Sequence, residues 1–177
     1  MTRNTKTSRL LQILRHSFAT LFSRAAPQVL KPEHQRQLAL CIAQAEQGHR
    51  GEIRLIVEAT LPSLQIWQGR TARQRAIQWF SDLRVWDTEC NSGIVLYLLL
   101  ADHKIEIVAD RGIAAQVPQA SWNQICKNLQ DQINQAQLLE GLEQALCALG
   151  DLLRMHFPLQ QDEINPDELS NDVVFRN

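Results

Sequence analysis

Residues that could do chemistry gather where the most regular strand pattern of the chain ends. Asp110, Arg111 and Gly112 directly follow the alternating segment 104–109. A carboxylate can bind a cation and a guanidinium can bind a phosphate, so the pair could form a binding site. The alternative, which we favour, is a tight turn. In that turn Gly112 supplies a positive φ, Asp110 caps backbone amides and Arg111 pairs with a neighbouring acid.

A second group of polar side chains lies in the turn-rich segment 86–93. Asp87, Glu89 and Asn91 alternate along the chain, so an extended loop could direct three oxygen ligands to one calcium ion. Glu58, at the end of an earlier strand, could join them. A solvated turn is the alternative that we favour for this loop. Trp86 stands beside these acids, and an exposed tryptophan there would suit contact with a protein.

These two groups give the predicted site. Its candidate metal ligands, for Ca²⁺ or another divalent cation, are Asp87, Glu89 and Asp110. Its candidate binding residues are Arg111, Gly112, Glu58 and Trp86. The sequence has no glycine-rich phosphate loop, no Gly-x-Ser-x-Gly and no Cys-x5-Arg motif. Catalysis by a side-chain nucleophile is therefore not predicted, and a hydrolase would need water activated by a metal ion.

Composition places the chain among ordinary globular proteins. It has 177 residues, 45% of them hydrophobic and 21% charged, and a net charge of −1, which predicts one domain that does not bind nucleic acid. The four cysteines form no CxxC pair and the five histidines are scattered, so we expect buried, reduced thiols rather than a zinc site. We find no membrane span and no secretory signal, which predicts a cytoplasmic protein.

The periodicity of apolar residues predicts the elements that must position these side chains. We expect helices at about 32–47, 71–83, 122–133 and 138–157, and strands at 52–58, 94–100 and 104–109. Thr71 should be an N-cap, Trp79 should lie in the core, and Pro62, Ser63 and Gly69 indicate an irregular loop. Strand 52–58 should bury one face better than the other, whereas strand 94–100 should be covered on both faces. A helical crossover makes the first two strands parallel, and a short connection makes the third antiparallel to the second. The predicted fold is a three-layer α/β/α sandwich with a small mixed sheet, in the order α-β-α-β-β-α-α.

Both ends of the chain differ from its centre. Residues 8–23 predict an amphipathic helix, and basic side chains surround it in the segment 8–24. Such a helix can pack on its own domain, on a partner protein or on an anionic membrane surface. The other end is acidic, and we expect it to be mobile, with the apolar run 173–175 able to dock. We therefore divide the chain into a basic segment 1–30, a domain 31–158 and an acidic tail 159–177.

An ordered set of motifs resembles the TPM domain, also called the TPM phosphatase domain. The likeness is carried by Gly51-Glu52-Ile53-Arg54, by the helix 72–83 that leads to Asn91-Ser92-Gly93-Ile94-Val95-Leu96, and by Ala109-Asp110-Arg111-Gly112-Ile113. It covers about residues 33–157. The family occurs in bacterial membrane-associated proteins and in thylakoid lumen proteins. This chain differs from common members, which have a signal peptide, a membrane helix and often Gly-x-Gly after the third strand.

The resemblance implies a three-layer α/β/α fold and two kinds of function. Acid phosphatase activity has been attributed to plant members, some members bind calcium, and bacterial relatives are often encoded near LemA-type membrane proteins. We expect a binding module that works at an anionic membrane surface through residues 8–24, or with a LemA-like membrane partner, on the inner side of the membrane. The alternative is a divalent-metal-dependent acid phosphatase of low activity.

Overall fold

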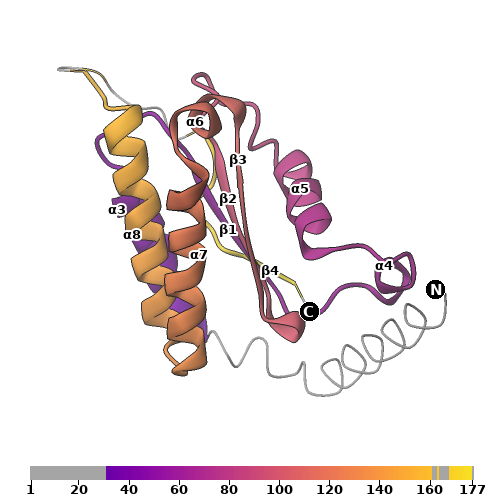
Figure 1. Ribbon diagram of the computed structural model, residues 1–177. Coiled ribbons are helices and arrows are strands. Elements are labelled where there is room, and N and C mark those ends of the chain that lie inside the picture. The colour runs from indigo at the N-terminus through magenta and orange to yellow at the C-terminus, as the bar shows by residue number, and fades with distance from the viewer. Residues whose placement is uncertain (1–30, 161–162, 164–167, 177) are drawn as a thin grey trace.

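A four-stranded mixed sheet with strand order β3-β2-β1-β4 organises the molecule (Figure 1). The computed structural model describes residues 31–160, 163 and 168–176. The elements in chain order are α3 (Pro32–Ala45), β1 (Ile53–Glu58), α4 (Ser63–Trp67), α5 (Ala72–Asp82), β2 (Ile94–Leu99), the 3-10 turn η2 (Leu100–Asp102), β3 (Lys104–Ala109), α6 (Arg111–Gln116), α7 (Gln119–Asn134), α8 (Leu138–His156) and β4 (Val174–Arg176).

The pairing of the first three strands confirms the prediction. β1 and β2 are parallel, with Leu55 opposite Leu96, and α5 lies between them in the chain. β2 and β3 form an antiparallel hairpin in which Leu96 also lies opposite Ile107. The fourth strand was missed: β4 pairs in parallel with the outer edge of β1. Its three residues are too few to give a period that sequence analysis could detect.

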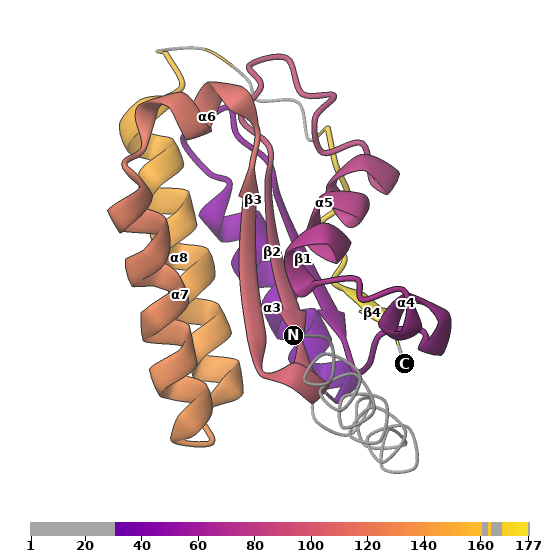
Figure 2. The same ribbon diagram turned by 45° about the vertical axis from the view of Figure 1, so that its right-hand side comes forward.

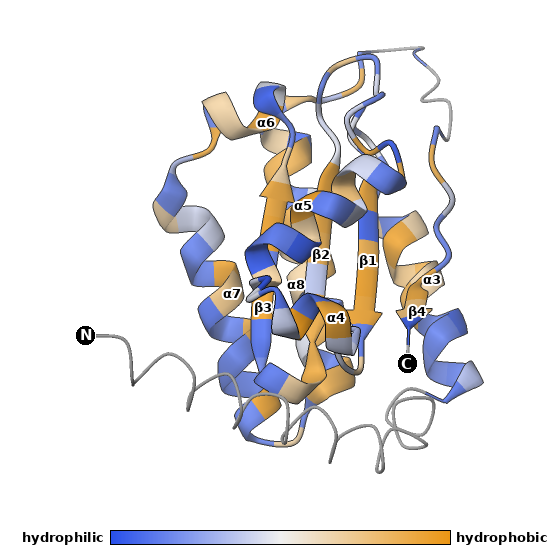
Figure 3. Ribbon diagram, turned by 90° about the vertical axis from the view of Figure 1, so that its right-hand side faces the viewer, coloured by the Kyte–Doolittle hydropathy of each residue, from blue (hydrophilic) through white to orange (hydrophobic). Residues whose placement is uncertain are grey.

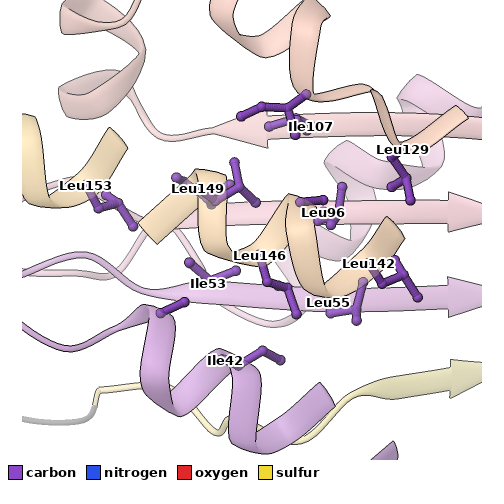
Figure 4. Close-up of a cluster of buried hydrophobic side chains, with 14 of the residues drawn as sticks. Ile42, Ile53, Leu55, Leu96, Ile107, Leu129, Leu142, Leu146, Leu149 and Leu153 are labelled. Atoms are coloured by element: carbon purple, nitrogen blue, oxygen red, sulfur yellow. The ribbon is translucent and has the colours of Figure 1, made fainter. Parts of the chain in front are cut away.

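Helices cover both faces of the sheet, which confirms the predicted three layers. α3, α7 and α8 pack on one face, and α4 and α5 pack on the other (Figure 2). On the first face, side chains from α3 and α8 such as Ile42, Leu146 and Leu149 lie over Ile53 and Leu55 of β1 (Figure 4). The buried residues of α5 include Ala72, Ala76 and Trp79, whereas the helix as a whole is mainly hydrophilic (Figure 3). Each central strand is therefore buried on both faces.

That burial corrects the prediction for β1. All six of its residues are buried, including Arg54 and Glu58. The alternation of polar and apolar residues in the sequence indicated that one face of this strand would be partly exposed to solvent. The polar side chains are instead enclosed, and Glu58 is enclosed together with a cation from α5. Buried charges are tolerated when they are paired, so the pairing explains why the sequence pattern misled.

Two local predictions also change. The segment 62–69, predicted as an irregular loop, contains the single-turn helix α4. Asp110-Arg111-Gly112 is not an isolated turn, because Asp110 is the N-cap of α6. Thr71 is the N-cap of α5, as predicted. Its hydroxyl accepts a hydrogen bond from the amide of Gln74, and the Gln74 side chain accepts one from the amide of Thr71.

The predicted tails are described only in part. The amphipathic segment 8–24 lies outside the described residues, and the domain boundaries at 30/31 and 158/159 stay predictions. The tail is ordered over 168–176, which corrects the expectation that only its apolar run docks. Four free cysteines confirm the absence of disulfides, but Cys147 is exposed and the others are half-buried, so the predicted burial is wrong. In the part of the chain that the structure describes, no helix is long and apolar enough to cross a membrane.

Candidate functional site

The acidic loop 86–93 and the start of α6 lie at the same end of the sheet and touch each other (Figure 1). The loop leads into β2 and α6 follows β3, and the hairpin register places Ile94 opposite Ala109. Arg111 donates a hydrogen bond from Nε to the Asn91 side-chain oxygen at 2.9 Å. The guanidinium therefore pairs with an amide, not with the neighbouring acid that the sequence predicted.

Gly112 is required at this junction because a larger residue would not fit, and not because of its φ. The amides of Gly112 and Ile113 donate to the Asn91 carbonyl oxygen at 3.0 and 3.3 Å. A Cβ on Gly112 would stand 2.6 Å from that oxygen and 2.7 Å from the Cys90 carbonyl oxygen. Among the described glycines only Gly48 and Gly69 have positive φ, so the predicted left-handed turn at Gly112 is wrong. The loop and α6 are held together by backbone contact at this point.

Asp110 is the buried carboxylate of this junction, with 8% exposure. One carboxylate oxygen, Oδ1, accepts a hydrogen bond from the Arg111 amide at 2.6 Å, which confirms the predicted capping role. The other oxygen, Oδ2, is buried and has no hydrogen-bond partner in the described part of the molecule. A buried acceptor without a partner is costly, so this oxygen marks a place where a donor or a cation would be stabilised.

The three predicted metal ligands are not assembled into a site. Asp87 and Glu89 have exposed side chains, whereas Asp110 is buried. Within residues 31–160, 163 and 168–176, no three His, Cys, Asp or Glu side chains are close enough to hold one metal ion. As described, these residues do not form the oxygen cage that calcium requires. The calcium site stays a prediction, and no chemical step is derived from it.

Glu58 does not join the acidic loop. It lies opposite Leu99 at the carboxyl end of β1, whereas the loop precedes the amino end of the parallel strand β2. Its carboxylate accepts hydrogen bonds from Arg75 Nε at 2.8 and 3.1 Å and from the Tyr97 hydroxyl at 2.6 Å. Burial, followed by the nearby Glu58 charge, raises the pKa of Tyr97 far above its usual value. The hydrogen bonds with Glu58 raise the pKa of Arg75, so its guanidinium stays charged.

The same cluster extends to the end of the chain. The Arg75 guanidinium carbon lies 4.7 Å from the centre of the Trp79 ring, and that of Arg176 lies 5.7 Å from it. Trp79 was predicted to be a core residue, and it is 6% exposed. Sequence analysis missed the cluster because its members are far apart in the chain. Arg75 among the apolar positions of α5 was the one available signal, since an arginine on a buried helix face requires a partner.

Exposed apolar side chains mark both ends of the sheet. Trp86 is half exposed at 50%, as predicted, beside the acidic loop. At the opposite end, Leu64 and Trp67 of α4 are 68% and 74% exposed. These two positions are three residues apart on one helical turn, so they lie on one side of α4. Sequence analysis missed them because it assigned their segment to a loop.

Comparison with known proteins agrees with this geometry. A search of curated proteins finds no match. Among solved structures, the chain is similar to the NMR structure of the BA42 protein from the psychrophilic bacterium Bizionia argentinensis, with 27% sequence identity and a TM-score of 0.71. That match covers 82% of this chain and 94% of the other. The family model for the TPM domain matches residues 24–152, which is more than half of the chain. The chain therefore belongs to the TPM domain family.

Proposed function

We propose that this TPM domain is a binding module that attaches to an anionic membrane surface. The observation that carries the proposal is the exposure of Leu64 and Trp67, one turn apart on α4. Tryptophan and leucine side chains presented on a short helix suit the boundary between lipid headgroups and acyl chains. Arg70 lies three residues after the end of this helix, where it donates a hydrogen bond to Gln78, and it supplies a cation near α4.

The point at which the basic segment joins the domain also supports membrane binding through this end of the sheet. α3 begins at the end of the sheet where β1 and β4 finish and α4 stands (Figures 1 and 2). Residues 8–24 therefore connect, through the short stretch 25–30, to the end that exposes Leu64 and Trp67. Basic side chains near an anionic surface contribute about 1 kcal/mol each, so this segment and α4 could bind one vesicle together.

Vesicle co-sedimentation tests the proposal with the full chain. We expect binding to phosphatidylserine-containing vesicles and much weaker binding to phosphatidylcholine alone, with the difference lost at high salt. Replacing both apolar side chains (Leu64→Ser with Trp67→Ala) should weaken binding several-fold, and so should Arg9→Glu with Arg15→Glu. Trp86→Ala is the matched control, since this exposed tryptophan lies at the other end of the sheet.

Two results would reject the lipid version of the proposal. One is the absence of any preference for anionic vesicles. The other is unchanged binding after both sets of substitutions. If the chain does not bind lipid vesicles but captures a LemA-like membrane protein, the lipid version is also rejected, in favour of a protein partner at the inner membrane.

The alternative function is a divalent-metal-dependent phosphatase, and one observation favours it. Oδ2 of Asp110 is buried without a hydrogen-bond partner beside the acidic loop. The test is turnover of a phosphate monoester with added divalent ions. Activity that survives Asp87→Ala combined with Asp110→Ala would exclude this site.

A further inference from the structure

The last described residues of the chain bind along β1 as an extended peptide would. Residues 168–176 run beside this strand from its amino end to its carboxyl end, and the final three form β4 (Figure 1). Val174 lies opposite Ile56, and Arg176 lies opposite Glu58. The Ala59 amide donates a hydrogen bond to the Arg176 carbonyl oxygen at 2.8 Å. This segment lies beyond the region that matches the TPM domain, which ends at residue 152.

The domain meets this peptide with features distributed along the whole edge. At the amino end of β1, the buried carboxylate of Glu52 accepts hydrogen bonds from the amides of Glu168 and Leu169, both at 3.3 Å. At the carboxyl end, the Trp79 ring faces the Arg176 guanidinium at 5.7 Å. A carboxylate that binds backbone amides does not discriminate between peptide sequences, because every residue except proline has an amide. An aromatic ring that faces a cation, in contrast, selects a basic residue at that position.

Side chains of residues 173–175 alternate between the two cores, and Leu169 adds a further apolar contact. Val174 and Leu169 pack against the cluster beneath α5, whereas Val173 and Phe175 pack against the cluster beneath α3 and α8. Alternation of this kind is how a strand added to a sheet edge gains specificity, since every second side chain enters the same layer. The groove thus fits an apolar run followed by a cation.

The domain binds the segment 168–176 only weakly. β4 has three residues, all of them half-buried or exposed. A cavity of about 380 Å³ remains between the tail and the end of α3, lined in part by Glu46, Glu52 and Asn171. Short edge strands with such packing open at low free-energy cost relative to the core.

We propose that the edge of β1 is a peptide-binding groove, which the chain's own residues 168–176 occupy in the free protein. Its partner is an extended segment of another protein with an apolar run followed by a basic residue, added in parallel to β1. Such a partner binds when the tail leaves, so the tail acts as an internal competitor and sets the apparent affinity.

The experiment uses a fluorescent peptide with the sequence of residues 168–176 and measures its anisotropy with the full chain. The variant Val174→Pro weakens the internal strand. Since the Arg176 carbonyl points toward β1, the backbone of residue 174, two positions earlier, points the same way, and proline removes its amide donor. If the wild-type groove is open in about a tenth of molecules, Val174→Pro should bind the peptide about tenfold more tightly than the wild-type chain does.

Further variants make the result specific. Arg176→Ala changes an exposed side chain, so this variant should fold normally. It should raise affinity for the peptide by a smaller factor than Val174→Pro does. Asp172→Ala is the matched control, because this exposed tail residue contacts Ser170 within the tail and should leave affinity unchanged. The same peptide with proline at the position of Val174 should not bind any of these chains.

Three outcomes would overturn the proposal. The first is no peptide binding by Val174→Pro or Arg176→Ala chains that unfold cooperatively in urea. The second is equal affinity in the wild-type chain and both variants, because the tail would then not compete. The third is dimerisation of the wild-type chain that Val174→Pro abolishes, because the occupant would then be the tail of a second copy.

Discussion

Removal of Arg75 should strongly destabilise the fold. Glu58 is 1% exposed, and its carboxylate accepts three hydrogen bonds from this guanidinium, at 2.5, 2.8 and 3.1 Å. Arg75→Met keeps an unbranched apolar stem but leaves the carboxylate buried without its cation. Breaking a buried ion pair in this way costs about 3–5 kcal/mol. That is a large part of the roughly 5–15 kcal/mol by which domains are stable.

Urea unfolding followed by tryptophan fluorescence measures the effect. With a denaturant slope of about 1–3 kcal/mol per molar, the midpoint should fall by at least about 1 M. Arg73→Met is the control on the same helix. The Arg73 side chain is 50% exposed, its ion pair with Glu106 spans 3.8 Å, and it donates one hydrogen bond to the Ile107 carbonyl oxygen, so its loss should cost about 1–2 kcal/mol, less than the loss of Arg75.

A double variant separates the ion pair from simple loss of packing. Glu58→Leu combined with Arg75→Met removes both charges, so the cost should be at least about 1 kcal/mol smaller than the sum of the two single costs. The reasoning is refuted if Arg75→Met lowers the free energy of unfolding by less than about 1 kcal/mol. Strict additivity of the two changes would refute it as well.

Three further predictions concern other parts of the fold. Gly112→Ala should destabilise the protein by about 1–3 kcal/mol in urea unfolding, because its Cβ would meet the Asn91 carbonyl oxygen at 2.6 Å; stabilisation, the usual effect of alanine within a helix, would contradict the packing. His49 is fully buried, and burial lowers its pKa, so it is neutral in the folded protein. The unfolded chain then binds more protons, and the free energy of unfolding should fall as pH drops below about 6.5. A His49→Gln chain with the same pH dependence between 7.5 and 5.5 would contradict this. Burial raises the pKa of Cys126 to about 11, so iodoacetamide at pH 8 should modify exposed Cys147 first, as peptide mass spectrometry can show; equal rates would contradict the assignment.

The sequence by itself determined the order and type of the main elements. Apolar runs and their periods predicted the helices around Leu38 and Trp79 and the hairpin of β2 and β3, because burial on one face imposes a regular spacing. Thr71 predicted the start of α5, because an N-cap is a local interaction, and the structure adds Gln74 to it as a capping box. Local signals of this kind need no knowledge of distant residues.

The tertiary structure alone decided what the polar residues do. Glu58 was expected to face a metal ion and instead pairs with Arg75, 17 positions away. Gly112 was expected to adopt a positive φ and instead makes room for the carbonyl of Asn91. Only the run 173–175 of the tail was expected to dock, whereas all of residues 168–176 lie along β1, because Glu52 and Trp79 meet them there. Each of these roles depends on which chain segments meet in space, and a pattern within one segment carries no information about its partner.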